Sequence, residues 1–348
     1  MDEKKKAVLT NIGKMLTKAT MTVAPYALAD IAYKKMFFKR TNSNPLQGFK
    51  NDCFPSLIAE KATFQSGKNT LTGYYYHYPK YKDSKIVIFV HGFGNGHHRY
   101  LDIINYLASK SFLVFSYDMT SFDESEGQGI FGFPQAIIDL AHAVNLVKKD
   151  RKYKDKDIVI MGHSMGGYAT GCYLNINPHI SKVVMFSSFN KSSSLIRQHG
   201  YEWAGERIDG TIGCIDEYEE FRFGATSSLT VLDGLKNSKA RALIVHSKDD
   251  KTVPIAVGLD LYKEELGRNR NVNFIKLDNV GHGTVYDSKE GKAYYESLLK
   301  QYSKYVKENK VVNDEDKVNL FNLLVDQDKW TNMLNHSLMD KVVSFIKK

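Results

Sequence analysis

The sequence has few cysteines and no long apolar run. Among its 348 residues are only Cys53, Cys172 and Cys214, which lie far apart and form no CxxC pair. A sparse, odd set argues against a disulfide framework and a cysteine-based zinc site, and it is typical of a reducing compartment, so we expect a cytoplasmic location. No apolar stretch approaches the roughly 18 residues that a membrane-spanning helix needs. The chain is still long enough to bury a large core, as one domain or as a domain with an insertion.

Positive charge is concentrated at one end of the chain. The net charge is +9, and residues 1–40 supply +6 of it. The rest of the chain is close to balanced, with no basic stripe interleaved with aromatic residues and no motif that reads bases. We therefore predict no nucleic-acid partner.

The N-terminal segment has the pattern of a basic amphipathic helix. Residues 7–24, AVLTNIGKMLTKATMTVA, place apolar side chains at i, i+3 and i+4 spacing. Pro25 should end this helix, and a second helix is expected over residues 26–38. Lys14 and Lys18 interrupt the apolar run, which argues against a secretory signal peptide. Two interpretations stay open: an arm packed on the body, or an arm on the anionic inner face of a membrane.

From about residue 55, short apolar runs alternate with helical stretches. The runs are LIAEKATF, LTGYYYHYP, KIVIFVHG, FLVFSYD, DIVIMGH, KVVMFSS, ALIVHS and NVNFIKL. The helical stretches are expected at about 99–109, 134–149, 165–175, 255–266 and 287–307. This alternation predicts an α/β fold with eight mostly parallel strands and helices on both faces. The first two runs have mixed polarity and predict an antiparallel start, with GYYYHYP as an edge hairpin.

One interval breaks the alternation. About fifty residues, 190–239, separate KVVMFSS from ALIVHS, which is too long for a plain crossover connection. We expect a small inserted cap over the carboxyl ends of the strands, where such sheets bind their ligands. The predicted organisation is thus a helical arm over residues 1–50 and one domain over residues 51–348, with the cap at about 190–239.

The segment IVIMGHSMGG places one serine between glycines at the end of an apolar strand. Residues 162–166 read Gly-His-Ser-Met-Gly, a G-x-S-x-G pattern with a strand before it and a small-residue helix after it. A sharp strand-to-helix turn would hold Ser164 in a strained conformation, and only small residues at Gly162 and Gly166 would avoid a clash. The hydroxyl would then lie at a helix N-terminus, which favours negative charge. The alternative is a glycine-rich turn whose serine only caps the helix.

A serine hydroxyl needs a base, and the base needs an acid that orients it. LIVHSKDDKTVP ends a predicted strand with Asp249 and Asp250, and FIKLDNVGHGTVY ends the last strand with His282 between two glycines. The chain order Ser164, Asp250, His282, with each residue just beyond a strand, is that of the α/β-hydrolases. Asp249 stays open as the acid if the strand ends one residue earlier.

These motifs resemble those of α/β-hydrolase-fold serine hydrolases, in particular the bacterial group of small esterases, lipases and serine-aminopeptidase-like proteins. The resemblance covers about residues 55–310. It implies that the acid is Asp250, in a D-x-x-V-P motif, and that the base is His282, in a Gly-His turn. It also implies an oxyanion hole formed by the backbone amides of Phe93, in the HGFG turn after KIVIFV, and of Met165.

The sequence departs from that family at one loop. Relatives often carry Arg-Gly-His-Gly-x-Ser after the strand that here reads FLVFSYD, whereas residues 118–129 read DMTSFDESEGQG. This pocket wall is therefore not predicted. For the adjacent His97 and His98 we expect a surface position at a helix N-terminus rather than a metal site. For the acidic run that includes Glu219 we expect a solvated surface, with the binding of a substrate amine as the alternative.

The expected function is that of a carboxylesterase or lipase-like serine hydrolase, which cleaves a small-molecule acyl ester through an acyl-enzyme. No metal or organic cofactor is expected. An aminopeptidase-like peptidase and an acyltransferase stay open, because the triad alone does not choose among them. A non-catalytic binding module is a further alternative. A peripheral membrane contact through residues 1–40 also stays open.

Overall fold

The structure is a computed structural model that describes residues 30–348 except residues 45, 82 and 83. The helix predicted over residues 7–24 lies outside the described residues. Residues 30–37 are helical, within the second helix predicted for this segment. Within the described part of the chain, no helix has the length and apolar character needed to cross a membrane.

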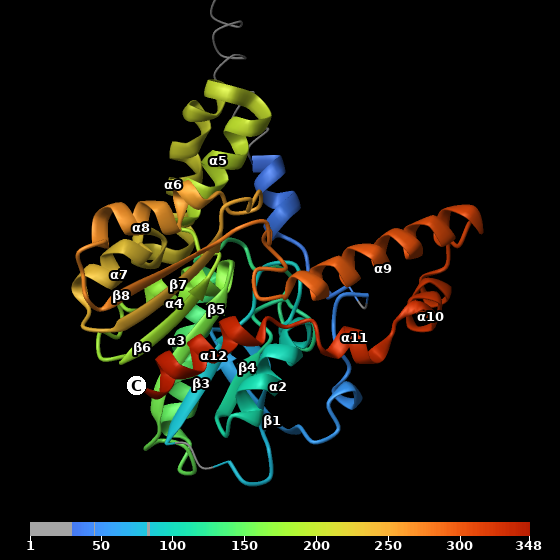
Figure 1. The fold of residues 1–348 in the computed structure, drawn as a ribbon. Helices are drawn as coiled ribbons and strands as arrows, with labels where there is room; N and C mark the ends of the chain where they lie inside the picture. The colour runs from blue at the N-terminus through green and yellow to red at the C-terminus, as the bar shows by residue number, and fades with distance from the viewer. Residues whose placement is uncertain (1–29, 45, 82–83) are drawn as a thin grey trace, which may run out of the picture.

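A single sheet of eight strands forms the centre of the molecule (Figure 1). In chain order the strands are β1 (Ile58–Ser66), β2 (Asn69–His77), β3 (Lys85–Val90), β4 (Leu113–Tyr117), β5 (Asp157–His163), β6 (Lys182–Phe186), β7 (Arg241–Ser247) and β8 (Val272–Leu277). Their spatial order is β1-β2-β4-β3-β5-β6-β7-β8. β2 pairs antiparallel with β1 and β4, and the remaining pairs are parallel. The predicted α/β sheet with an antiparallel start is confirmed, although β1 rather than β2 forms its edge.

The two faces of the sheet bury separate apolar cores. In β3, Ile86 and Ile88 face one core, whereas Val87 and Phe89 face the other. Both faces of a central parallel strand are covered, which is why KIVIFV reads as an unbroken apolar run rather than an alternating one.

Helices cover both faces, as the alternating pattern predicts. One face carries α3 (Gln135–Lys149), α4 (Met165–Tyr173), α7 (Val231–Asn237) and α8 (Leu259–Leu266). The other carries α2 (Leu101–Ser109), α9 (Lys289–Glu308), α10 (Asp314–Leu324), α11 (Gln327–Thr331) and α12 (His336–Lys347). α9 and α10 project to one side of the body in Figure 1.

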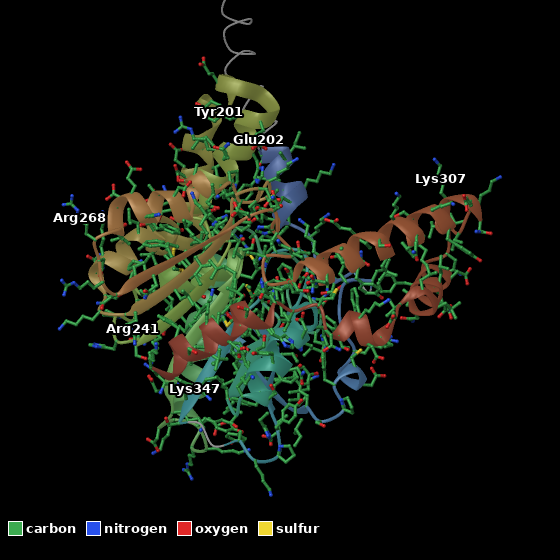
Figure 2. The ribbon with its side chains drawn as sticks, viewed as in Figure 1. Tyr201, Glu202, Arg241, Arg268, Lys307 and Lys347 are labelled. Carbon is green, nitrogen blue, oxygen red and sulfur yellow. The ribbon has the colours of Figure 1, made fainter. Side chains whose placement is uncertain are left out.

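The long interval between β6 and β7 forms α5 (Ser192–Ala204), α6 (Asp209–Phe223) and α7. Figure 2 shows Tyr201 and Glu202 of α5 near the top of the molecule, well above Arg241, the first residue of β7, on the left. α5 and α6 therefore stand at the carboxyl ends of the parallel strands, beside the helix of residues 30–37. α7 instead packs tightly on α4, because a Cβ at Gly234 would lie 2.2 Å from the carbonyl oxygen of Gly171.

Candidate active site

Ser164 occupies a sharp turn between β5 and α4. Its backbone has φ 55° and ψ −119°, a conformation that residues other than glycine rarely adopt. A Cβ at Gly162 would lie 2.3 Å from the carbonyl oxygen of Gly166, and a Cβ at Gly166 would lie 2.1 Å from that of Val90. The Ser164 amide donates to the carbonyl of Phe186 at 2.8 Å. The glycines are thus required for the close approach that holds the strained serine.

Asp250 and His282 meet at the carboxyl ends of β7 and β8. The Nδ1 atom of His282 lies 2.7 Å from Oδ2 of Asp250. The other carboxylate oxygen, Oδ1, accepts the amide hydrogens of Thr252 at 2.9 Å and Val253 at 2.8 Å. An ionised carboxylate only accepts hydrogen bonds, so Nδ1 of His282 carries a hydrogen, and in the neutral imidazole Nε2 is the nitrogen without one.

Local contacts keep the Asp250 carboxyl ionised. Burial alone would raise its pKa, but hydrogen bonds from His246 and His282, together with the amide of Val253, hold the pKa well below the usual range. Nε2 of His246 lies 3.3 Å from Oδ2 of Asp250 and 2.8 Å from the carbonyl oxygen of Val253. An anion fixed in this way favours an imidazole orientation in which Nδ1 points inward.

The neighbouring Asp249 makes different hydrogen bonds, and among the described residues none of them joins it to the imidazole of His282. Its Oδ1 accepts the hydroxyl hydrogen of Ser247 and, at 3.1 Å, the amide hydrogen of Gly281. Asp249 therefore fixes the start of the turn that carries His282, whereas Asp250 contacts the imidazole itself. Of the two candidate acids, the structure brings Asp250 to His282.

His282 is connected to the serine turn through His163. Nε2 of His163 lies 3.1 Å from the backbone carbonyl oxygen of His282, and the two rings have centroids 4.7 Å apart. Among the described residues no hydrogen bond joins the Ser164 hydroxyl to His282. Catalytic hydrogen bonds are often long in the absence of substrate, and Ser164, 7% exposed, lies at the same edge of the sheet.

The HGFG turn runs beside Ser164. A Cβ at Gly92 would lie 3.3 Å from Cβ of Ser164, and Gly94 has φ +96°. No acceptor is recorded within the described residues for the backbone amides of Phe93 and Met165. The turn thus passes close to Ser164.

An aromatic wall adjoins the HGFG turn, and the sequence patterns did not predict it. The Phe37 ring, from the N-terminal helix, lies 5.7 Å from the Phe93 ring and 4.9 Å from the Phe133 ring. Phe133 in turn lies 5.1 Å from Phe189, which follows β6. The helix of residues 30–37 is therefore part of the surroundings of the site, a long-range contact that helical periodicity cannot reveal.

Two predicted surface positions are wrong. His97 is completely buried, with Nδ1 2.7 Å from Oδ1 of Asp118 and Nε2 2.8 Å from the Tyr76 hydroxyl. Glu219 is also completely buried, and Oε1 accepts hydrogen bonds from the hydroxyls of Tyr33 at 2.8 Å and Ser192 at 2.7 Å. In both cases the partners come from distant parts of the chain.

The loop after β4, for which the family pattern fails, is held by Asp118 and Ser125. The Ser125 hydroxyl donates to the backbone carbonyl of Asp118 at 2.5 Å and accepts the Thr72 amide at 2.9 Å. Of the residues that the structure describes, no group of three or more His, Cys, Asp or Glu side chains is arranged to hold a metal ion.

Known proteins share both the fold and part of the sequence. A family described as serine aminopeptidase, S33, matches residues 81–207. A monoglyceride lipase of Rattus norvegicus is 37% identical over 86 residues, and that of Mus musculus is 36% identical. Each alignment covers 24% of this chain, and the chain spans only 28% of the length of these curated relatives.

Solved structures show the same architecture. An esterase of Pyrococcus furiosus superimposes with a TM-score of 0.53 at 17% identity, covering 78% of this chain and 98% of the esterase. An acylaminoacyl peptidase of Pyrococcus horikoshii gives a TM-score of 0.51 at 18% identity, covering 71% of this chain and 41% of the peptidase. Together with the strand order, these likenesses show that the chain has the α/β-hydrolase fold.

Proposed function

We propose that this protein is a serine hydrolase that cleaves a carboxylic ester through an acyl-enzyme intermediate. The observation that carries the proposal is the contact of His282 with Asp250 at the same sheet edge as the strained Ser164. A strained serine between a strand and a helix, with an oriented imidazole at the same sheet edge, is what a nucleophile elbow provides.

The proposed reaction begins with attack by Oγ of Ser164 on the acyl carbonyl carbon, while Nε2 of His282 takes the hydroxyl proton. Asp250 accepts the Nδ1 hydrogen and stabilises the imidazolium cation. The tetrahedral intermediate then collapses: the ester C–O bond breaks, and Nε2 returns its proton to the departing alcohol. Water attacks the acyl-enzyme with His282 again as base, and the carboxylic acid leaves as the proton returns to Ser164.

The amides of Phe93 and Met165 are the proposed donors to the developing oxyanion. Both belong to turns that border Ser164, and neither has a recorded acceptor within the described residues. Met165 also opens α4, whose N-terminal dipole favours negative charge. Preorganised donors of this kind contribute about 3 to 4 kcal/mol each to the stability of the transition state.

An apolar acyl group of modest length is the proposed substrate feature. Phe37, Phe93 and Phe133 pack edge to face beside the HGFG turn. Such rings favour an alkyl or aryl chain over a charged one. α5 and α6, at the carboxyl ends of the strands, are the proposed cap over this acyl group.

A panel of chromogenic esters of graded acyl length, with aminoacyl amides alongside, tests the proposal. Ser164→Ala serves as the blank, and a fluorophosphonate probe reports whether Ser164 is nucleophilic. We expect ester hydrolysis and probe labelling in the native protein and neither in Ser164→Ala. A folded native sample that neither labels nor hydrolyses would instead support a binding module. Added alcohol acceptors distinguish hydrolysis from acyl transfer by their products.

A peptidase activity is the second candidate, favoured by the match of residues 81–207 to the serine aminopeptidase family. The same nucleophile and base would act, with an amine in place of the alcohol as leaving group. Preferential cleavage of the aminoacyl amides in the panel would choose this candidate.

We also propose that the N-terminal helix and α6 contact a lipid surface. Ile31 and Met36 are 61% and 45% exposed on the helix of residues 30–37, and Phe221 on α6 is 91% exposed. Tyr33 packs on Tyr218, with ring centroids 5.1 Å apart, so the two elements adjoin. Apolar side chains beside basic ones suit an anionic interface.

Co-sedimentation with phosphatidylserine-containing vesicles tests this contact. We expect the double variant Ile31→Asn, Phe221→Asn to sediment less than the native chain. Leu323→Asn is a matched control, because Leu323 is 83% exposed but belongs to α10 on the projecting side of the body. Equal sedimentation of all three proteins would refute the contact.

A further inference from the structure

Tyr100 lies between two of the turns that form the candidate site. It ends the short helix η2 (His97–Tyr100), which follows the HGFG turn. Its hydroxyl oxygen lies 3.0 Å from the backbone nitrogen of Gly92 and 2.9 Å from Nδ1 of His163. His163, the residue before the nucleophile, reaches the backbone carbonyl of His282 through Nε2 at 3.1 Å. Tyr100 and His163 are both buried.

These contacts form a series of hydrogen bonds from the Gly92 amide to the His282 carbonyl, and the two end groups fix the direction of each bond. The Gly92 amide can only donate, so the Tyr100 oxygen accepts from it. The His282 carbonyl can only accept, so Nε2 of His163 carries the hydrogen. Nδ1 of a neutral His163 is then a bare acceptor, and it takes the hydroxyl hydrogen of Tyr100. Every polar atom of the two side chains is used, and one tautomer of His163 is selected.

We propose that Tyr100 and His163 are positioning residues. Their hydrogen bonds hold three turns at fixed positions relative to one another: the HGFG turn, the turn at Ser164 and the turn that carries His282. The expected effect on catalysis rests on the proposed function, whereas the hydrogen bonds themselves follow from the distances. Through Gly92 this series of hydrogen bonds sets the turn that carries the Phe93 amide. Through the carbonyl of His282 it fixes the backbone from which the imidazole extends.

A neutral His163 is essential to this arrangement. Burial, with a further effect of His282, holds the pKa of His163 well below its usual value. A cation there would have no acceptor nitrogen for Tyr100 and would lie beside the imidazolium that forms on His282, since the ring centroids are 4.7 Å apart. Asp250 and Arg99 are the other charged groups close enough to affect His163.

Arg99 makes a second contact between η2 and the turn that carries His282, at Gly283. Its Nη2 donates to the backbone carbonyl of Gly283 at 3.3 Å, and its guanidinium lies 5.6 Å from the centre of the Tyr286 ring. Two consecutive residues of η2 therefore hold two consecutive carbonyls of the His282 turn, Arg99 directly and Tyr100 through His163.

The first test is Tyr100→Phe, which removes one oxygen and both of its hydrogen bonds. We expect kcat on the best ester to fall about 10- to 100-fold with KM changed less than about threefold, because misaligned groups affect the transition state more than substrate binding. Tyr106→Phe is the matched control, since the Tyr106 hydroxyl donates to Asp340 at 2.6 Å, joining α2 to α12 away from the site. This control should retain native kcat.

The second test asks whether the hydrogen bond from Nε2 of His163 to the His282 carbonyl matters for kcat. His163→Gln retains an amide donor at the distance of Nε2, whereas His163→Asn is too short to reach the His282 carbonyl. We expect kcat to decrease in the order native, His163→Gln, His163→Asn. Because Asn is also smaller than Gln, His163→Leu is the packing control: it is no smaller than Gln and has no donor, so its kcat should fall at least to the level of His163→Asn.

The third readout is independent of activity. Nitrogen-15 NMR of histidine-labelled protein should show His163 with a protonated Nε2 and a bare Nδ1, assigned by loss of the signals in His163→Gln. In Tyr100→Phe the hydrogen should stay on Nε2, because the His282 carbonyl still accepts it, whereas the Nδ1 signal should shift on losing the Tyr100 hydrogen bond. Native kcat in Tyr100→Phe, or a native His163 protonated at Nδ1, would overturn the inference. If the native protein hydrolyses nothing, the proposed function fails, while the tautomer still decides whether the hydrogen-bond chain exists.

Discussion

Among the described residues, two histidines at the carboxyl ends of the strands place Nδ1 2.7 Å from an aspartate, and these two pairs differ in what the rest of the imidazole can do. In the first, Nδ1 of His282 lies 2.7 Å from Asp250, and in the second, Nδ1 of His97 lies 2.7 Å from Asp118. Both carboxylates have pKa values held well below the usual range: burial opposes ionisation in each, and the histidine partner helps to reverse it. By distance and charge alone, the two pairs are equivalent.

The pairs differ at the far nitrogen of the imidazole. Nε2 of His97 is bonded to the Tyr76 hydroxyl at 2.8 Å, and the His97 side chain is fully buried. Nε2 of His282 has no recorded partner among the described residues, and the side chain is 16% exposed. An aspartate can orient an imidazole for either structure or proton transfer, and a free outer nitrogen beside a nucleophile distinguishes the two.

The largest expected effect comes from breaking the first pair. Asp250→Asn should lower kcat by about 10⁴-fold, because an amide in this position favours the wrong tautomer of the base. Ester hydrolysis near neutral pH measures the loss, and circular dichroism confirms that the fold is retained. Asp249→Asn is the neighbouring control and should lose far less, because Asp249 contacts Gly281 and Ser247 rather than the imidazole. Equal losses in both variants would remove Asp250 from its proposed role.

Breaking the second pair should affect stability instead. Asp118 accepts the His97 amide at 2.9 Å as well as Nδ1, and its Oδ2 accepts the Glu124 amide at 3.3 Å. Asp118→Asn should lower the free energy of unfolding by about 3 kcal/mol, as in other disrupted buried pairs. Urea denaturation measures the change, and kcat of the fraction that stays folded should remain within a few-fold of native.

The pH dependence of that loss has a definite sign. The folded-state pKa of Asp118 is depressed, so its stabilising contribution is present above the unfolded carboxyl pKa and is lost as pH falls toward the folded value. The difference between native protein and Asp118→Asn should therefore shrink in acid. A difference that is constant between neutral pH and pH 3 would contradict the assignment.

The comparison also explains what the sequence could and could not predict. Apolar runs alternating with helical periods predicted the sheet, and the glycines around Ser164 predicted the turn, because both depend on nearby residues. The family resemblance favoured Asp250 over Asp249, and the turn after β7 brings Asp250 to His282. The burial of His97 and Glu219 depended on Tyr76 and Tyr33, whose proximity arises only from the tertiary fold.

A buried carboxylate without a histidine should behave in the opposite way. Burial raises the pKa of Glu219 to about 7, although hydrogen bonds from Ser192 and Tyr33 oppose the shift. A raised folded-state pKa means that stability is fully present below the unfolded value and is lost as pH rises through the folded value. On the order of 2 kcal/mol should be lost between about pH 4.5 and 7 in the native protein and be absent in Glu219→Gln.

Denaturation of both proteins across this pH range checks the prediction. The difference between them is the relevant quantity, because Asp287, whose pKa burial also raises to about 7, contributes equally to both. Parallel stability curves for the two proteins would show that Glu219 is ionised in the fold.

The smallest expected effect comes from making the second pair resemble the first. Tyr76→Phe frees Nε2 of His97 and leaves the Asp118 contact intact. The loss of one buried hydrogen bond should lower the free energy of unfolding by about 1 to 2 kcal/mol. No new hydrolysis should appear when this substitution is added to Asp250→Asn, because His97 is fully buried and, within the described part of the chain, its side chain hydrogen-bonds only Asp118 and Tyr76. Fluorophosphonate labelling with peptide mapping measures this, and a second labelled serine that depends on His97 would show that a free nitrogen is sufficient without the position that His282 occupies.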